Sequence, residues 1–269
     1  MYVHKRCSGD RSMSGFCTNL LSQFLPVMVN KISNRFYIKE YALLFFSTLL
    51  MLNAAAQDPG YTRPPVTDKW DEYQQQVKKD SLKRMVELKD MIPGIVYDLR
   101  YASRNNFMKR QMYPPNTNFT YLRLPAAKAL QKVQAELNEK GYGLKIFDAY
   151  RPYSVTVKFW ELVKDERYVA NPSKGSGHNR GVAVDLTIIN TKTGKELNMG
   201  TGFDNFSDTA HHTFTQLSEE ILQNRELLKS TMEKYGFNTY TAEWWHYSLP
   251  GSAKFEILDI DFKKLKKDL

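Results

Sequence analysis

Two short motifs contain the residues that are best suited to chemistry. The segment from Ser176 to Asp185 reads SGHNRGVAVD, and the segment from Glu243 to His246 reads EWWH. His178, Asp185 and His246 form a set of two imidazoles and one carboxylate, which can bind a divalent metal and leave a fourth position open to water. Glu243, three residues before His246, is a candidate base for that water. The pattern predicts a hydrolase with one zinc ion per chain.

Each of these residues also has a purely structural interpretation. His178 could be an ordinary loop histidine, Asp185 a capping residue, and Glu243 and His246 the polar ends of an aromatic strand. A single His or Asp at a motif position is weak support for a metal site. The chain has only five histidines, however, and two of them fall in these two motifs. The combination favours a metal site, while the choice of zinc rests on ligand type and leaves other divalent ions open.

The two motifs resemble the zinc D-alanyl-D-alanine dipeptidases of the VanX type, within the wider group of metallopeptidases that cleave D-Ala-D-Ala or peptidoglycan. The resemblance runs in the family's order from about Ile95 to Leu249, through DAYRP at 148–152, MGTGFD at 199–204, the histidine pair at 211–212 and MEKYGF at 232–237. The metal motif alone would indicate only the wider group. The Arg-Pro segment, the Phe-Asp pair and the doubled Trp before the last histidine point to the dipeptidase branch.

This resemblance implies roles for four further residues. Arg151 would stabilise the oxyanion of the tetrahedral intermediate, a role in which one donor is worth on the order of 3 kcal/mol; the alternative is a structural salt bridge with Asp148. Asp204 and Tyr101 would bind the ammonium of a dipeptide substrate, and Ser176 would lie near its C-terminal side. The alternative for Asp204 is a loop residue that bonds its own backbone.

Buried strands must position these side chains. The apolar run 182–188 predicts a central strand that carries Asp185, where an unpaired carboxylate would be costly and a metal ion would offset the cost. A strand over 143–149 would deliver Asp148 and Arg151 at its C-terminal end. Helices are predicted over 68–79, 125–140, 154–163 and 217–235, and further short strands over 85–88, 95–101, 237–240 and 244–249.

This order of elements predicts a single α+β domain, with helices packed against a mostly antiparallel sheet. The resemblance implies the fold shared by Hedgehog proteins and DD-peptidases. Residues three apart lie on opposite faces of a regular strand, so a bulge or a strand end is needed to turn Glu243 and His246 toward the same site. Trp244 and Trp245 are interpreted as core and pocket wall, and the histidine pair at 211–212 as structural.

The N-terminal quarter predicts export. The apolar run 41–52 follows several basic residues and precedes three alanines, which is typical of a signal peptide cleaved near Ala56. The alternative is an uncleaved anchor, for which the run is short. We therefore divide the chain into an extension with signal peptide (1–56), a linker (57–67) and a metallopeptidase domain (68–269). The mature protein would be periplasmic or extracellular, without a stable membrane span.

The length of the segment before the apolar run is unusual for a signal peptide. Met28 begins the sequence MVNK, which would give a conventional start, so we interpret residues 1–27 as an extension of the gene model. Either Met1 or Met28 is therefore the true start. Cys7 and Cys17 both lie in this extension, and the predicted domain contains no cysteine.

The charge of the predicted domain argues against a nucleic-acid partner. Without residues 1–56 the chain has 32 basic and 27 acidic residues, so the net charge falls from +9 to +5. Part of the remaining excess is a lysine-rich tail at 263–267, and basic clusters with interleaved aromatics are absent. We expect a small dipeptide as substrate, with peptidoglycan fragments as further partners.

The leading hypothesis is an exported zinc dipeptidase that hydrolyses D-Ala-D-Ala to free D-alanine. One alternative is a D,D-carboxypeptidase or endopeptidase that acts on peptidoglycan, whose open groove would not need Asp204. The other is a non-catalytic, zinc-stabilised module that binds the cell wall. Glu243 argues against the module, because a purely structural metal site needs neither a base nor an open position.

Overall fold

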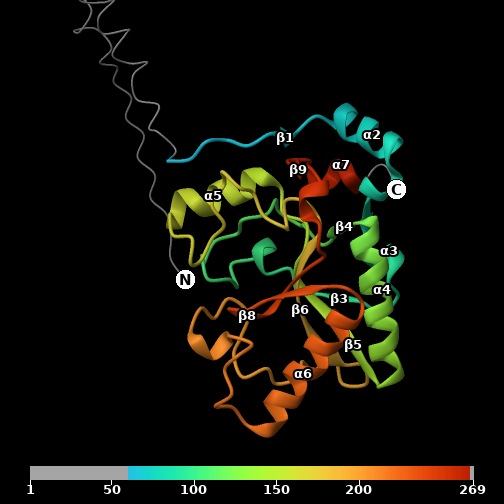
Figure 1. The fold of residues 1–269 in the computed structure, drawn as a ribbon, viewed down its shortest axis with the longest axis vertical. Coiled ribbons are helices and arrows are strands. Elements are labelled where there is room, and N and C mark those ends of the chain that lie inside the picture. The colour runs from blue at the N-terminus through green and yellow to red at the C-terminus, as the bar shows by residue number, and fades with distance from the viewer. Residues whose placement is uncertain (1–59, 267–269) are drawn as a thin grey trace, which may run out of the picture. The chain divides into compact units, whose positions relative to one another are not determined.

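The computed structural model describes residues 60–266 (Figure 1). The predicted signal peptide, its cleavage near Ala56, the start at Met28 and both cysteines lie outside the described residues. Val66–Thr67, at the end of the predicted linker, form strand β1, which pairs in parallel with β9 (Ile257–Leu258). None of the helices in the described part combines the length and the apolar character needed to cross a membrane.

A five-stranded sheet forms the centre of the domain. Its strand order is β3 (Val96–Tyr97), β5 (Tyr142–Asp148), β6 (Ala183–Asn190), β8 (Glu243–Ser248) and β7 (Asn238–Tyr240). Only β3 and β5 pair in parallel, and the other neighbours are antiparallel. The prediction of a mostly antiparallel sheet with a buried central strand is therefore confirmed, because β6 lies in the middle and seven of its eight residues are buried.

The helices confirm the α+β prediction. They are α2 (Trp70–Lys79), α3 (Leu88–Met91), α4 (Leu124–Glu139), α5 (Tyr153–Val163), α6 (Glu219–Lys234) and α7 (Phe262–Lys266). Single 3-10 turns cover Ser81–Lys83, Arg100–Ala102, Asp208–Ala210 and Ser252–Lys254. Helix α4 begins with proline in its first turn, where the missing N–H costs nothing, and ends before Gly141, whose φ of +79° suits a glycine after a helix.

The main apolar core covers one face of the sheet. Alternate residues of β6 pack there against apolar residues of α4 and α6, in a cluster that includes Leu130, Val133, Leu137, Val184, Leu186, Ile188, Leu228 and Met232. Because side chains alternate along a strand, Asp185 points to the opposite face. The sheet thus separates the main core from the face that carries the polar residues of interest.

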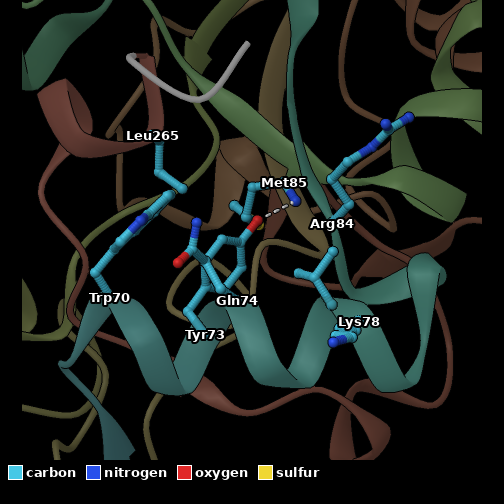
Figure 2. A pocket seen from close by; sticks show the side chains of 8 residues that line it. Trp70, Tyr73, Gln74, Lys78, Arg84, Met85 and Leu265 are labelled. Atoms are coloured by element: carbon cyan, nitrogen blue, oxygen red, sulfur yellow. Dashed lines mark hydrogen bonds between the residues drawn. The ribbon is translucent and has the colours of Figure 1, made fainter.

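A second, aromatic core supports that polar face. It joins α2, α5 and α7 through buried side chains that include Tyr73, Tyr101, Tyr113, Tyr121, Tyr150, Phe159 and Phe262. Figure 2 shows how α2 is attached: the main-chain N–H of Met85 donates to the hydroxyl of Tyr73 at 2.8 Å, beside Trp70 and Leu265. Each of the tyrosines just named has a hydrogen-bonded hydroxyl, so these buried rings contribute apolar packing without an unpaired polar atom.

Two details of the predicted elements were wrong. The strand expected over 95–101 ends at Tyr97, and Tyr101 lies in a 3-10 turn, because the ladder to β5 stops after the N–H of Asp98 donates to Ile146. Strand β4 (Tyr121–Arg123) was not predicted; it pairs with β2 (Met85–Glu87). All three of its residues are buried, so it has no apolar–polar alternation that could reveal it.

Candidate metal centre and active site

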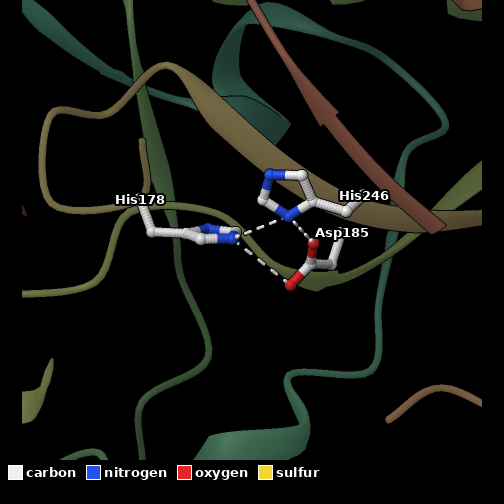
Figure 3. Close-up of side chains that lie close together, drawn as sticks. All are labelled: His178, Asp185 and His246. Atoms are coloured by element: carbon white, nitrogen blue, oxygen red, sulfur yellow. Dashed lines mark hydrogen bonds and ion pairs between the residues drawn. The ribbon is translucent and has the colours of Figure 1, made fainter. Parts of the chain in front are cut away.

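Three potential metal ligands meet on the polar face of the sheet (Figure 3). Asp185 and His246 are register partners on the antiparallel strands β6 and β8, and His178 reaches them from the loop before β6. One ligand atom from each residue lies within 4.8 Å of the others. The structure thus brings together the three residues that the motifs suggested as ligands.

The hydrogen bonds of His178 orient its ring toward the other two residues. Its Nδ1 lies 2.7 Å from the carbonyl oxygen of Ala149, which can only accept, so Nδ1 carries the proton. The lone pair of Nε2 then faces the Nδ1 of His246 at 3.3 Å and Oδ2 of Asp185 at 3.4 Å. A backbone acceptor on the outer ring nitrogen is the usual support for a metal-bound histidine.

Asp185 and His246 are electrostatically coupled. Nδ1 of His246 lies 2.8 Å from Oδ1 of Asp185. Burial alone would raise the pKa of Asp185, but the imidazoles of His178 and His246 outweigh burial and lower it. Burial lowers the pKa of His246, but the Asp185 carboxylate outweighs this effect and raises it. The buried carboxylate therefore favours a positive charge at this position, which a divalent cation can supply.

Glu243 lies beside this group. Its Oε2 is 3.9 Å from Nδ1 of His246, although the two residues are three apart on β8. The predicted bulge is confirmed: the pairing of β7 with β8 moves from Thr239–Tyr247 to Tyr240–Glu243, so the register breaks between the two pairs. Burial raises the pKa of the Glu243 carboxyl, and the nearby imidazoles offset part of that increase. A carboxyl of this kind can both accept and return a proton.

Arg151 both forms a salt bridge with Asp148 and lines the cavity that holds the candidate ligands. Its Nη2 and Nε lie 2.6 Å and 3.1 Å from Oδ2 of Asp148, so the salt bridge exists. The same guanidinium lines the pocket and lies over the rings of Tyr101 and Phe159. Burial opposes its charge, but Asp148 outweighs burial and raises the pKa of Arg151. Arg151 is thus a permanently charged group held in place by a buried partner.

Tyr101 and Asp204 form a second polar pair in the pocket. The Tyr101 hydroxyl donates to the Asp204 carboxylate at 3.0 Å and 3.2 Å. Asp204 has a φ of 59°, an uncommon value for a residue other than glycine. Burial raises its pKa well above the ordinary value, and the charge of Asp185 adds to this effect. Because burial disfavours the ionised form of this carboxyl group, a cation bound beside it would stabilise its negative charge.

Sequence reasoning missed two residues that organise the site. The Tyr113 hydroxyl donates to Oδ1 of Asp148, the carboxylate oxygen that Arg151 does not contact. The fully buried side chain of Asn179 donates to the carbonyl of Arg151 and to Thr156, both at 2.8 Å, and accepts from the N–H of Ser176 at 3.0 Å. Asn179 stands inside the first motif, and its place beside the candidate ligand His178 was the only signal available.

The eight predicted site residues line one cavity of about 250 Å³. They are Tyr101, Arg151, Ser176, His178, Asp185, Asp204, Glu243 and His246. Trp245 also lines the cavity, and the buried Trp244 donates from its indole to Thr201 at 2.8 Å, which confirms their interpretation as core and pocket wall. The roles of the eight residues remain predictions, but they share one site.

Comparison with known proteins identifies the family. A family model described as "D-ala-D-ala dipeptidase" matches residues 81–267, which is more than half of the chain. The chain belongs to this family. Its members are metallopeptidases, so the protein is an enzyme, and the resemblance drawn from the motifs is confirmed.

Several relatives of this protein are described as D-alanyl-D-alanine dipeptidases. The D-alanyl-D-alanine dipeptidase of Escherichia coli is 33% identical over 66% of this chain and 91% of its own length. Those of Enterococcus faecalis and Streptomyces coelicolor are 32% and 30% identical over 60% of this chain and 89% and 88% of their own lengths. The solved structure of the LdcB LD-carboxypeptidase matches 70% of this chain and 78% of its own at 19% identity, with a TM-score of 0.36, too low to support a conclusion.

Proposed function

We propose that this protein is an exported zinc dipeptidase that hydrolyses D-Ala-D-Ala to two molecules of D-alanine. The observation that carries the proposal is that a metal-ligand group, a candidate base and a separate cation-binding pair, Tyr101 and Asp204, line one cavity of about 250 Å³. A free dipeptide needs this combination, because its ammonium lies only a few bonds from the amide that is cleaved.

Zinc fits the residues that would hold it. Two imidazole nitrogens and one carboxylate oxygen converge from His178, His246 and Asp185, a donor set that suits zinc and leaves an open position. The backbone acceptor at Ala149 directs the lone pair of His178 inward. One ion per chain would supply Lewis-acid activation of water and of the scissile carbonyl.

The residues of the chain handle the protons and the developing charge. Glu243 takes a proton from the attacking water, whose oxygen bonds to the carbonyl carbon, and returns that proton to the amine nitrogen as the C–N bond breaks. Arg151, which Asp148 holds in place, stabilises the negative charge on the carbonyl oxygen. The raised pKa of Glu243 assists the return of the proton to the leaving amine.

The two ends of the dipeptide meet different groups. The Asp204 carboxylate, fixed by the Tyr101 hydroxyl, binds the ammonium. Ser176 lies on the substrate's C-terminal side, and its hydroxyl accepts from the N–H of Asn179 at 3.2 Å, which holds the loop around it. Because the ammonium and the carboxylate of a free dipeptide would both be bound within a small cavity, we expect a strong preference for unblocked dipeptides.

The site of action is proposed from the N-terminal sequence. The apolar run 41–52 and the alanines that end at Ala56 support secretion. Outside the cytoplasm the enzyme would not meet the dipeptide that cells make for wall synthesis. We therefore propose salvage of D-Ala-D-Ala released from the wall, or a part in wall turnover.

The test is hydrolysis of D-Ala-D-Ala and of N-acetyl-D-Ala-D-Ala by the purified, zinc-loaded protein. We expect free D-alanine from the first substrate only, and no activity after chelation until zinc returns. Cleavage of the acetylated substrate at a similar rate would replace this proposal with a D,D-carboxypeptidase. Turnover of neither substrate by the zinc-bound protein would refute the dipeptidase assignment.

A further inference from the structure

The loop that carries Asp204 is held at both ends by one side chain, that of Arg225. This Asp204 loop runs from Met199 to His211 and contains a single 3-10 turn near its end. Arg225 lies on helix α6 and is buried. Its Nε donates to the carbonyl of Met199 at 2.8 Å, at the start of the loop. Its Nη2 and Nη1 donate to the carbonyls of Thr209 at 2.9 Å and His211 at 3.2 Å, at the end of the loop.

The shape of the guanidinium suits this bridge. Three different nitrogens of Arg225 make the three hydrogen bonds, and every acceptor is a main-chain carbonyl oxygen. A planar guanidinium presents its N–H groups in fixed directions, so it can join chain segments that approach it from different sides. These bonds also compensate for the burial of its charge. The two ends of the loop are therefore held at a fixed separation.

The start of the Asp204 loop lies directly against α6. Gly200 has a φ of +81°, which favours glycine. A Cβ at this position would lie 3.1 Å from a side-chain carbon of Ile221 in α6 and 3.2 Å from one of Leu217. Because no side chain fits there, the loop comes close enough to α6 for Arg225 to reach both of its ends.

The middle of the loop has a backbone that needs this support. Asp204 has a φ of 59°, and an uncommon value of this kind persists only where the surrounding structure holds it. The ring of Phe203 packs against that of Phe147, with centroids 4.9 Å apart, and the Tyr101 hydroxyl donates to the Asp204 carboxylate. These contacts hold side chains, whereas the bonds of Arg225 hold the main chain on both sides of Asp204.

We propose that Arg225 is a positioning residue for Asp204: by holding both ends of the Asp204 loop on α6, it keeps the carboxylate where the substrate ammonium binds. This inference rests on the proposed function insofar as Asp204 binds that ammonium. The hydrogen bonds themselves do not depend on the substrate.

Three variants test this role. Arg225→Lys keeps a positive charge on α6 but presents its donors from a single nitrogen, so it cannot bridge the two ends in the same way. Arg225→Gln removes the charge as well, and it carries the same test if the lysine variant does not fold. Asn224→Ala is the matched control, because the Asn224 amide donates from the same helix to the carbonyl of Asn198 at 2.9 Å, outside the loop.

We expect Arg225→Lys to raise the KM for D-Ala-D-Ala by about 5- to 50-fold, because complete loss of a charge-assisted hydrogen bond sets an upper limit of about 150-fold. The kcat should fall by less than about threefold, since the candidate base and the metal ligands stay in place. Asn224→Ala should leave both constants within about twofold of the wild type. An Arg225→Lys enzyme with a wild-type KM, or one in which kcat falls as much as KM rises, would overturn the inference.

The Asp204→Asn background shows whether Arg225 acts through Asp204. If it does, Arg225→Lys should change the KM of the Asp204→Asn enzyme by less than about twofold, because the contact that it supports is already lost. A general structural role predicts the same loss in both backgrounds. That result would also overturn the inference.

A last measurement does not depend on activity. Amide hydrogen exchange over residues 200–208 should be faster in Arg225→Lys than in Asn224→Ala, with β6 and β8 unchanged. If the wild type fails to cleave D-Ala-D-Ala, the proposed function is wrong, and the exchange result alone decides whether Arg225 holds the loop. Unchanged exchange in that segment would show that it does not.

Discussion

The substitution Asp204→Asn tests how the pocket recognises a free dipeptide. Asparagine has nearly the same shape and, like aspartate, tolerates a positive φ, so the backbone at 59° should be retained. The amide oxygen can still accept from the Tyr101 hydroxyl. The variant therefore removes the negative charge and little else.

The expected loss follows from the kind of contact removed. A hydrogen bond between the Asp204 carboxylate and the substrate ammonium is charge-assisted and worth about 1.5–3 kcal/mol. Losing it should lower kcat/KM for D-Ala-D-Ala by about 10- to 150-fold. Most of the change should be in KM, since Asp204 contacts Tyr101 and not Glu243, the residue proposed to transfer protons.

The assay compares D-Ala-D-Ala with its N-acetylated form in wild type and variant. The acetylated compound has no ammonium, so its low kcat/KM should not fall further in Asp204→Asn. A loss for the free dipeptide of less than about threefold, far below the range expected for a charge-assisted bond, would refute the assignment. An equal loss for both compounds would show that Asp204 acts through the fold and not through the substrate amine.

The same variant makes a prediction about stability with a definite sign. The pKa of Asp204 is raised in the folded protein, so the folded state holds its proton more tightly than the unfolded state does. Stability therefore falls as pH rises from the ordinary carboxyl pKa up to the raised one, and the ionised group opposes folding at higher pH. Asp204→Asn should raise the Tm of the metal-free protein at neutral pH and less so at pH 4. A lower Tm at neutral pH would contradict this reasoning.

Three further predictions concern the metal site and its support. Glu243→Gln should lower kcat by about 10²- to 10⁴-fold while the protein still binds one zinc ion, measured by atomic absorption; wild-type turnover would exclude Glu243 as the base. His246→Ala should weaken zinc binding by more than about 100-fold, since even outer-shell changes cost 10- to 100-fold, and competition with a chelator would show an unchanged affinity if His246 is not a ligand. Asp148→Asn should lower the free energy of unfolding, measured in urea, by about 3–5 kcal/mol, because it leaves the buried Arg151 without its countercharge. A decrease below about 1 kcal/mol would mean that the pair behaves like an exposed salt bridge.

Much of the fold was predictable because its signals are local. Helix α4 has a proline at its start, apolar residues at three- and four-residue steps and a glycine after its end, so neighbouring residues specify it. The buried strand β6 was predictable from a run of apolar residues interrupted by Asp185. Elements with only two or three paired residues, such as β4, carry no such pattern, because their pairing partners are far away in the chain.

The site divides in the same way. The ligand set and the candidate base are visible because their residue types and their order are specific to a family, and that resemblance also pointed to Arg151 and Asp204. Tyr113 and Asn179 were not predicted to support the site, because a tyrosine and an asparagine have many ordinary uses. Their roles come from hydrogen bonds to residues between 23 and 35 positions away, as for Asn179 with Thr156 and Tyr113 with Asp148.

The sequence by itself determined the family and the residues that are candidates for chemistry: the potential metal ligands, the candidate base and the charged groups proposed to bind a substrate. Only the tertiary structure decided how they are arranged. The register of β6 with β8 places Asp185 beside His246, the bulge turns Glu243 toward them, and the Asp148 salt bridge holds Arg151 at the same cavity. The reason is physical: side-chain types are carried by each residue alone, whereas distances and pKa values depend on which distant residues folding brings into contact.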